Sequence, residues 1–357
     1  MDFTLDDDQA MVKALAERFV ADRYTAGARA GYRTSPCGYA PANWALLAEL
    51  GLFAIAFDEA DGGLGGGTVE VAAVMEAFGK GLVCEPFLAD VLLGGGLLAQ
   101  AGTVAQKDTW IAQIIAGEAH VGFAYAEHGG RFDLDRIETR YDGGRLTGTK
   151  TAVEGGGDAY VVTARDGDRV RLALVAGDAP GLSRRTYRLV DGAVAHELTF
   201  DAALAEPMDG GSEVLAKVID RARIAAVTDM IGSMDSLFIT TLDYVKQRRQ
   251  FGAPIGSFQA LQHRLADQYA ALEQARSHSY AALTGDPAAI AAAKSYVSAA
   301  AIRLGEECIQ LHGGMGVSDE LDIGHWHKRV LRLAILFGDA PYEQARYDRL
   351  RRGAAAA

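Results

Sequence analysis

Residues 248–263, RRQFGAPIGSFQALQH, separate two long stretches of helical periodicity. The segment starts with two basic residues that end one helix, passes through a Phe-Gly turn, and begins a second helix near Ser257 with Gln259 in its first turn. Arg carries a fixed fork of donors, and Gln offers a donor together with an acceptor. The segment therefore predicts an interhelical turn whose side chains are suited to a polar ligand.

A second stretch, IQLHGGMGVSDE at residues 309–320, has the same character. A helix is expected to end at Gln310, and the turn Gly313-Gly314-Met-Gly316 lets the backbone approach another molecule closely. Either stretch by itself is explained more simply as a helix cap and a turn. Together they suit a ligand shaped like a dinucleotide, with a diphosphate, an amide-like edge and a bulky ring system.

Long helical patterns surround these two stretches. Apolar residues recur at helical spacing in residues 6–116, 212–249, 258–283 and 287–311. Residues 121–204 differ, because short alternating runs such as AYVVTAR and RVRLALVAG with turns between them indicate strands. We therefore expect an α+β protein in three consecutive domains, which are helical at 1–118, β at 119–205 and helical at 206–357.

Composition and charge narrow the classes of function. Of the 357 residues 49% are hydrophobic, and the formal net charge of −12 argues against nucleic acid or an anionic membrane as partner. No apolar run reaches the roughly 18 residues of a membrane span, and the N-terminus lacks the features of a signal peptide, so a cytoplasmic protein is expected. His325 and His327 stand two apart on a helix and point to different faces, so no metal site is predicted.

The sequence resembles the acyl-CoA dehydrogenase family over nearly its whole length. The N-terminal MDFTLDDDQ, the run WALLAELGLFAIAFDEADGGLGGG and the strand FAYAEHGG are similar to family sequences, and the segments 248–263 and 309–320 are the most specific matches. The resemblance implies an N-terminal helical domain, a middle β-barrel or sandwich and a C-terminal four-helix bundle. It is to the shorter members, which are similar to small subunits of heteromeric enzymes acting on steroid-side-chain, dicarboxylic or aromatic-ring acyl-CoAs.

The resemblance implies oxidation of the Cα–Cβ bond of an acyl-CoA thioester. In the family a carboxylate base removes the α-proton while hydride passes from Cβ to N5 of FAD, so the flavin carries the hard step. Six residues match positions that contact the FAD of the neighbouring subunit, namely Arg248, Phe251, Gln259, Gln310, Gly313 and Gly314. The contacts that a subunit gives to its neighbour are therefore expected to be complete.

The contacts that a subunit makes with its own flavin and substrate match poorly. The family's Thr-Glu-Pro-Gly run is Ala126-Glu127-His128-Gly129 here, and the position of a substrate-contacting Ser holds Phe132. The family's Trp-Ile-Thr run aligns with Ala152-Val153-Glu154. A glutamate there places negative charge near a ring that becomes anionic on reduction, which opposes the chemistry.

The position of the catalytic base is also changed. It falls in ILFGDA, residues 335–340, on Phe337 or, with a shift of one residue, on Gly338. A minority of the family places the base just before an Arg on the long helix, which corresponds here to Ala222 ahead of Arg223. None of these three positions holds a residue that accepts a proton.

Two acids remain as candidates for the base. Asp229 is seven residues beyond Ala222 and lies within about 20° of the same helix face. It is explained more simply as an acid at a helix interface or cap. Asp339 lies in the correct loop but is displaced by one or two positions, so we place it below Asp229.

Three interpretations remain, and we favour the first. In the first, the chain supports a larger catalytic acyl-CoA dehydrogenase subunit in an α2β2 assembly and completes its FAD site, with acyl-CoA as substrate and an electron-transfer flavoprotein as acceptor. In the second, it is a self-sufficient homo-oligomeric flavoenzyme with an unusual base. In the third, it is a helical scaffold without flavin chemistry, which leaves Arg248, Gln259 and Gln310 without a purpose.

Overall fold

The computed structural model describes residues 4–25, 27–130, 132–134 and 136–356. The first three residues of the stretch MDFTLDDDQ therefore lie outside the described residues. The chain folds into two compact units, and each unit combines separate parts of the sequence. We call residues 1–26, 68–83 and 223–357 the helical unit, and residues 27–67 and 84–222 the mixed unit. The division into three consecutive domains stays a prediction.

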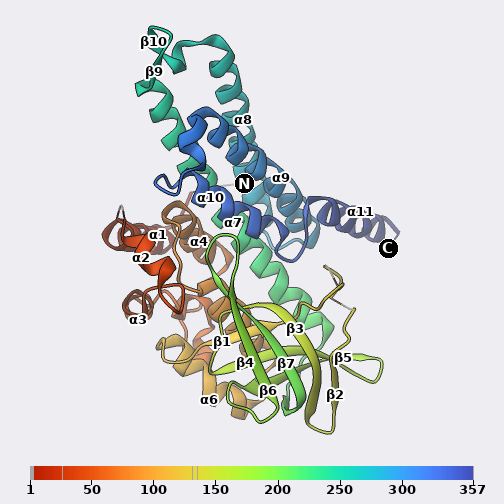
Figure 1. Ribbon diagram of the computed structural model, residues 1–357. Coiled ribbons are helices and arrows are strands. Elements are labelled where there is room, and N and C mark those ends of the chain that lie inside the picture. The colour runs from red at the N-terminus through yellow and green to blue at the C-terminus, as the bar shows by residue number, and fades with distance from the viewer. Residues whose placement is uncertain (1–3, 26, 131, 135, 357) are drawn as a thin grey trace. The chain divides into compact units, whose positions relative to one another are not determined.

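The helical unit contains the long helices that the sequence predicts. They are α1 (Asp7–Arg23), α4 (Thr68–Gly81), the part of α7 (Ser212–Gln247) beyond Ala222, α8 (Gln259–Ala282), α9 (Pro287–His312), α10 (Ile323–Ile335) and α11 (Ala340–Ala356) (Figure 1). A hairpin of β9 (Arg249–Gln250) and β10 (Ala253–Pro254), followed by a short 3-10 turn, connects α7 to α8. A second 3-10 turn, η5 (Gly313–Val317), follows α9.

Capping residues fix where two of these helices begin. The carboxylate of Asp6 accepts the backbone N–H of Gln9 at 2.8 Å, and the Gln9 side chain accepts the Asp6 N–H in return. Asp286 accepts the backbone N–H of Ala289 at 3.0 Å, while Pro287 occupies the first helical position of α9. These local signals explain why the helix starts lie close to the positions expected from the sequence.

An apolar core and close backbone packing hold the helical unit together. Met230 and Met234 of α7 are buried in one core with Leu272 of α8 and Val297 of α9. On another side of α7 the backbone of α4 comes so near that a Cβ at Gly79 would collide with the Asp229 carbonyl oxygen. The helix α4 therefore packs directly against the backbone of α7 at Asp229.

The mixed unit combines short helices with a sheet. Its helical elements are α2 (Ala28–Thr34), α3 (Pro41–Glu49), the 3-10 turns η1 (Ala54–Ala56) and η2 (Glu59–Asp61), the π-helix η3 (Phe87–Gly95), α5 (Gly96–Ala101), α6 (Val104–Ile115) and the first residues of α7. Among the described residues, none of the helices combines the length and the apolar character that crossing a membrane demands.

The described residues of the mixed unit form an eight-stranded sheet in the order β6-β7-β3-β2-β4-β5-β8, with β1 paired to β4 (Figure 1). Tyr160, Leu198 and Phe200 lie in its apolar core. The strands are β1 (Val121–Ala124), β2 (Arg140–Asp142), β3 (Arg145–Glu154), β4 (Ala159–Asp166), β5 (Arg169–Ala176), β6 (Leu182–Arg188), β7 (Val194–Leu204) and β8 (Glu206–Pro207). The predicted α+β fold is confirmed.

Candidate functional site

The two diagnostic stretches lie at the same end of the helical unit. The ring of Tyr244, near the end of α7, stacks on His312 at the end of α9 with ring centroids 4.2 Å apart. Arg264, in the second turn of α8, donates to Glu307 of α9 at 2.7 Å. These contacts place the turns 248–259 and 310–316, far apart in the sequence, at the same end of the helices. We call these two segments the turn end.

All six predicted flavin contacts are exposed at the turn end. Phe251 is 92% exposed at the tip of the β9–β10 hairpin, with φ at 52°. The side chains of Arg248, Gln259 and Gln310 make no hydrogen bond or ion pair with any other described residue. A Cβ added at Gly313 or Gly314 would meet nothing within 4 Å. The turn end thus presents unpaired donors beside open backbone, although contact with FAD stays a prediction.

In the mixed unit, Glu127 is turned into the protein. Its carboxylate lies 2.7 Å from the amine of Lys150, whose side chain is fully buried and also donates to Thr163 at 2.9 Å. The carboxylate further accepts from the hydroxyl of Thr139 at 2.6 Å and from the backbone N–H of Glu138 at 2.6 Å. Each of these hydrogen bonds stabilises the ionised form of Glu127 and holds its side chain inside the protein.

The pKa values of this pair follow from burial and mutual attraction. Burial lowers the pKa of Lys150 to about 8, and the adjacent Glu127 carboxylate limits the shift. Burial alone would raise the pKa of Glu127, but the hydrogen bonds from Lys150 and Thr139 outweigh it, so that the pKa is lowered. Glu127 is therefore ionised and stabilises the sheet.

Residues 152–154, which align with the family's Trp-Ile-Thr run, make contacts within the protein. The backbone N–H of Ala152 donates to the hydroxyl of Tyr187 at 2.8 Å. Ala152 has φ at 52°, and the β3–β7 register shifts between Lys150 and Val153. The side chain of Val153 is buried, whereas Glu154 is half-buried. The backbone donor of this run is thus already bonded within the sheet.

The loop between α10 and α11 carries no exposed carboxylate at the expected base position. Phe337 is 1% exposed and has φ at 58°, and a Cβ at Gly338 would collide with the carboxylate of Glu343. Asp339 accepts the backbone N–H of Tyr342 at 2.9 Å and so caps the start of α11. The structure thus gives Asp339 a capping role.

Two buried cations, Arg223 and Lys294, hold this loop in place. The sequence did not predict this role for either of them. Arg223 donates to Glu343 at 2.8 Å and to the Phe337 carbonyl oxygen at 2.8 Å. Lys294 of α9 donates to the carbonyl oxygens of Ala334 and Gly338, both at 2.9 Å. We call Arg223, Lys294, Glu343 and the loop 335–339 the loop cluster. The only sequence signal for Lys294 is its place as a lone lysine in an alanine-rich helix.

Burial controls the protonation of Lys294. Burial, together with the nearby Arg223, lowers the pKa of the amine to about 7, although the Glu343 and Asp339 carboxylates oppose the shift. The side chain is fully buried, and Ser298 accepts a third hydrogen bond from the amine at 3.2 Å. Lys294 therefore changes charge near neutral pH inside the loop cluster.

Asp229 is placed in an ion pair. Its side chain is fully buried, and its carboxylate accepts from Nη2 of Arg329 on α10 at 2.5 Å and from Nε at 3.2 Å. The hydroxyl of Ser233 lies 3.4 Å from the same carboxylate. This geometry favours the helix-interface interpretation of Asp229. The alternative base position, Ala222, is also fully buried.

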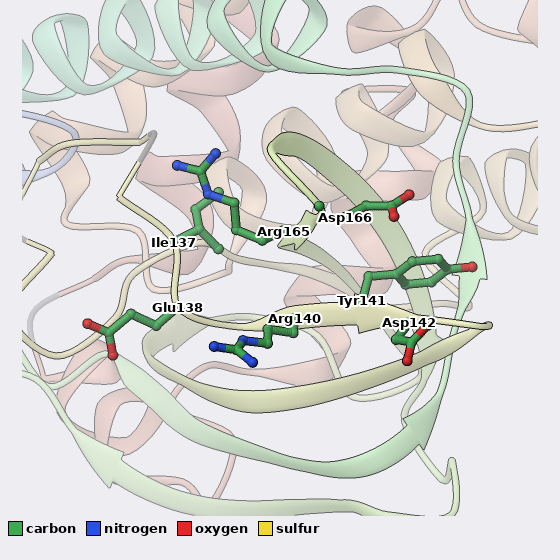
Figure 2. A pocket seen from close by; sticks show the side chains of 8 residues that line it. Ile137, Glu138, Arg140, Tyr141, Asp142, Arg165 and Asp166 are labelled. Atoms are coloured by element: carbon green, nitrogen blue, oxygen red, sulfur yellow. The ribbon is translucent and has the colours of Figure 1, made fainter.

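A hollow of about 830 Å³ lies on the sheet of the mixed unit, and Figure 2 shows side chains that line it. Arg140 and Arg165 are neighbours in the β2–β4 register, and the carboxylate of Asp166 is paired with Arg171 at 2.6 Å. No predicted site residue lines this hollow. Its lining mixes both charges and consists of Ile137, Glu138, Arg140, Tyr141, Asp142, Arg165, Asp166 and Gly167.

The order of helices and sheet, with a basic turn and a glycine turn at one end, is that of a class of flavin-dependent oxidoreductases. Two models of the acyl-CoA dehydrogenase family match the chain, the N-terminal domain at residues 6–118 and the C-terminal domain at residues 209–343. The chain belongs to the acyl-CoA dehydrogenase family, whose members act on CH–CH groups with FAD as cofactor.

Individual relatives cover almost the whole chain. The acyl-CoA dehydrogenase IpdE2 of Mycobacterium tuberculosis is 30% identical, and the alignment covers 92% of each chain. The Tcur3481-Tcur3483 steroid ACAD G363A variant superposes with a TM-score of 0.91 at 28% identity over 99% of this chain and 100% of that chain. The ChsE4-ChsE5 complex from Mycobacterium tuberculosis gives 0.90 at 26% identity over 98% of each chain.

Proposed function

We propose that this chain is the supporting subunit of a heteromeric acyl-CoA dehydrogenase and completes the FAD site of a catalytic partner. The observation that carries the proposal is the state of the turn end, where Arg248, Gln259 and Gln310 are exposed and have no partner among the described residues. A polar side chain without a partner contributes to binding only when a ligand supplies one. An FAD held by another subunit supplies such partners.

The residues of the turn end fit the parts of FAD. Arg248 is suited to the diphosphate because its guanidinium presents several donors to phosphate oxygens. Gln259 and Gln310 each offer a donor and an acceptor, and the open space beside Gly313 and Gly314 admits close backbone approach. When bound, FAD accepts the hydride from the acyl Cβ. The chain's own part is to bind and orient the cofactor.

The residues expected to serve a flavin and substrate of the chain's own do not fit that role. Glu127 is paired with Lys150, and the Ala152 N–H is bonded to Tyr187. Phe337 and Gly338 cannot accept a proton, and Asp229 is bound by Arg329. We therefore assign the removal of the α-proton to a carboxylate of the partner.

The partner is a larger acyl-CoA dehydrogenase subunit in an α2β2 assembly. Two structures similar to this chain, Tcur3481-Tcur3483 and ChsE4-ChsE5, are complexes of two different proteins. An acyl-CoA thioester is the substrate, and an electron-transfer flavoprotein accepts the electrons. The heteromeric relatives support this arrangement over the self-sufficient enzyme and the scaffold.

The test is expression of the chain alone and together with a candidate catalytic subunit. Alone, the purified chain should be colourless or contain less than one FAD per chain, and it should not oxidise acyl-CoAs. Co-expression should restore the yellow colour and the dehydrogenation. Full flavin loading with turnover by the lone chain would instead establish the self-sufficient enzyme.

A further inference from the structure

A second hollow, of about 270 Å³, lies within the mixed unit and includes none of the predicted site residues. Its lining comes from residues 56–58, at the end of η1 and just beyond it, and from η3, α5 and the first turns of α7. The side chains of Phe57, Leu92 and Val218 are buried and make an apolar floor. Polar groups stand around the floor, namely those of Asp58, Gln100, Lys217 and Arg221. An apolar floor with a few polar groups is the usual form of a small-molecule site.

Arg221 is the unusual group of this hollow. Its guanidinium donates from Nη1 to the Ala56 carbonyl oxygen at 3.1 Å, and no other described residue bonds to it. No carboxylate of the described residues lies within ion-pair distance, although Asp58 is close enough to act on it electrostatically. Burial lowers the pKa of this guanidinium, so the cation is partly desolvated without a counter-ion in contact.

The charged side chains around the hollow limit which ligands it can bind. Lys217 is one helical turn before Arg221, but its amine is paired with Glu213 at 2.8 Å and its side chain is mostly exposed. Asp58 supplies one negative charge near the opening. Arg221 offers a cation without a carboxylate in contact, whereas Asp58 repels anions, so a ligand with one negative charge fits better than a doubly charged phosphate.

We propose that this hollow binds a small monocarboxylate with an aliphatic body. The carboxylate accepts two parallel hydrogen bonds from Arg221, which is the geometry that a guanidinium offers to a carboxylate. The aliphatic body lies on Phe57, Leu92 and Val218 and is removed from water. The site is separate from the turn end and does not depend on the function proposed for the turn end.

Hexanoate is the probe, titrated into the full-length chain, alone or in its complex, and followed by calorimetry. We expect saturable binding that is weakened by about tenfold or more in Arg221→Gln, since a charge-assisted pair is lost. The matched control is Lys246→Gln, an exposed cation of the same helix that does not line the hollow, and this variant should bind as the unchanged chain does. Hexan-1-ol and inorganic phosphate test the apolar body and the charge separately, and both should bind more weakly.

Val218→Phe, which fills the floor, should abolish binding while the melting temperature in the absence of ligand shows that the fold is kept. Equal affinity of Arg221→Gln and the unchanged chain would overturn the proposal. Equal binding of hexan-1-ol would also overturn it, because the hollow would then select only for apolar character. Absence of any saturable hexanoate binding would overturn it as well.

Discussion

The turn end and the loop cluster of the helical unit use the same kinds of side chain in opposite ways. At the turn end, Arg248 and Gln259 are exposed and have no partner among the described residues. In the loop cluster, Arg223 and Lys294 are buried and bonded to a carboxylate and to backbone carbonyl oxygens. The difference supports the proposal that the turn end binds another molecule, whereas the loop cluster stabilises the fold.

The largest expected effect is that of Arg223→Ala in the loop cluster. It leaves the Glu343 carboxylate buried without its main partner and removes the bond to the Phe337 carbonyl. Breaking a buried ion pair from one side costs about 3–5 kcal/mol of the free energy of unfolding. Denaturant unfolding measures this loss. Arg303→Ala, at an exposed position of α9, is the control with the same charge change and should be nearly neutral.

Asp229→Asn separates the structural from the catalytic interpretation of that acid. Because Arg329 would lose its carboxylate partner, we expect the free energy of unfolding to fall by roughly 3 kcal/mol. The assembled enzyme, where it still folds, should keep its turnover per bound flavin. A variant of unchanged stability that has lost turnover would instead identify Asp229 as the base.

At the turn end, Arg248→Ala should affect binding and leave folding unchanged. A hydrogen bond to a charged group contributes about 1.5–3 kcal/mol, so FAD should dissociate from the assembled complex roughly tenfold to a hundredfold more readily. Retention of FAD on gel filtration and its fluorescence on release measure this. Arg249→Ala is the matched control, since Arg249 is also exposed but bonds to the carbonyl oxygen of Gly252. Equal effects of the two changes would mean that only general charge matters.

Lys294→Met is expected to change how the free energy of unfolding depends on pH. The pKa of Lys294 is lowered from 10.5 to about 7 in the folded chain, so between these values the unfolded chain binds one more proton than the folded chain. The amine therefore makes stability rise with pH across this window, by at most about 1.4 kcal/mol per pH unit. The variant should lose that part of the slope. An unchanged slope in unfolding experiments from pH 7 to pH 10 would contradict a neutral buried amine.

The sequence predicted those parts of the structure that depend on neighbouring residues. Helix starts such as that of α9 follow from a cap at Asp286 and a proline beside it. The turn end was recognisable because basic, glutamine and glycine residues lie close together in each of its two stretches. Exposure could be expected for these residues since they lie at helix ends or in the turns between helices.

The pairing of buried charges could not be predicted in the same way. Lys150 of β3 reaches Glu127 in the segment after β1, and Lys294 of α9 reaches Gly338 in the loop between α10 and α11. Such partners are brought together only by the tertiary fold, and a lone lysine has the same sequence appearance whether it is buried or exposed. The capping role of Asp339 was not predicted, although Pro341 and the polar run after it mark the start of α11 in the sequence.

The continuity of α7 has a consequence for how this chain can change in length. Arg223 and Asp229 lie on the same helix, and their partners Glu343 and Arg329 lie on two others. Each residue added to a helix turns the remainder of that helix by about 100°. A single insertion between Arg223 and Asp229 would therefore keep one ion pair and break the other, whereas seven added residues would restore the phase to within about 20°. Insertions and deletions should thus be absent from this part of α7 in functional variants, even where individual side chains differ.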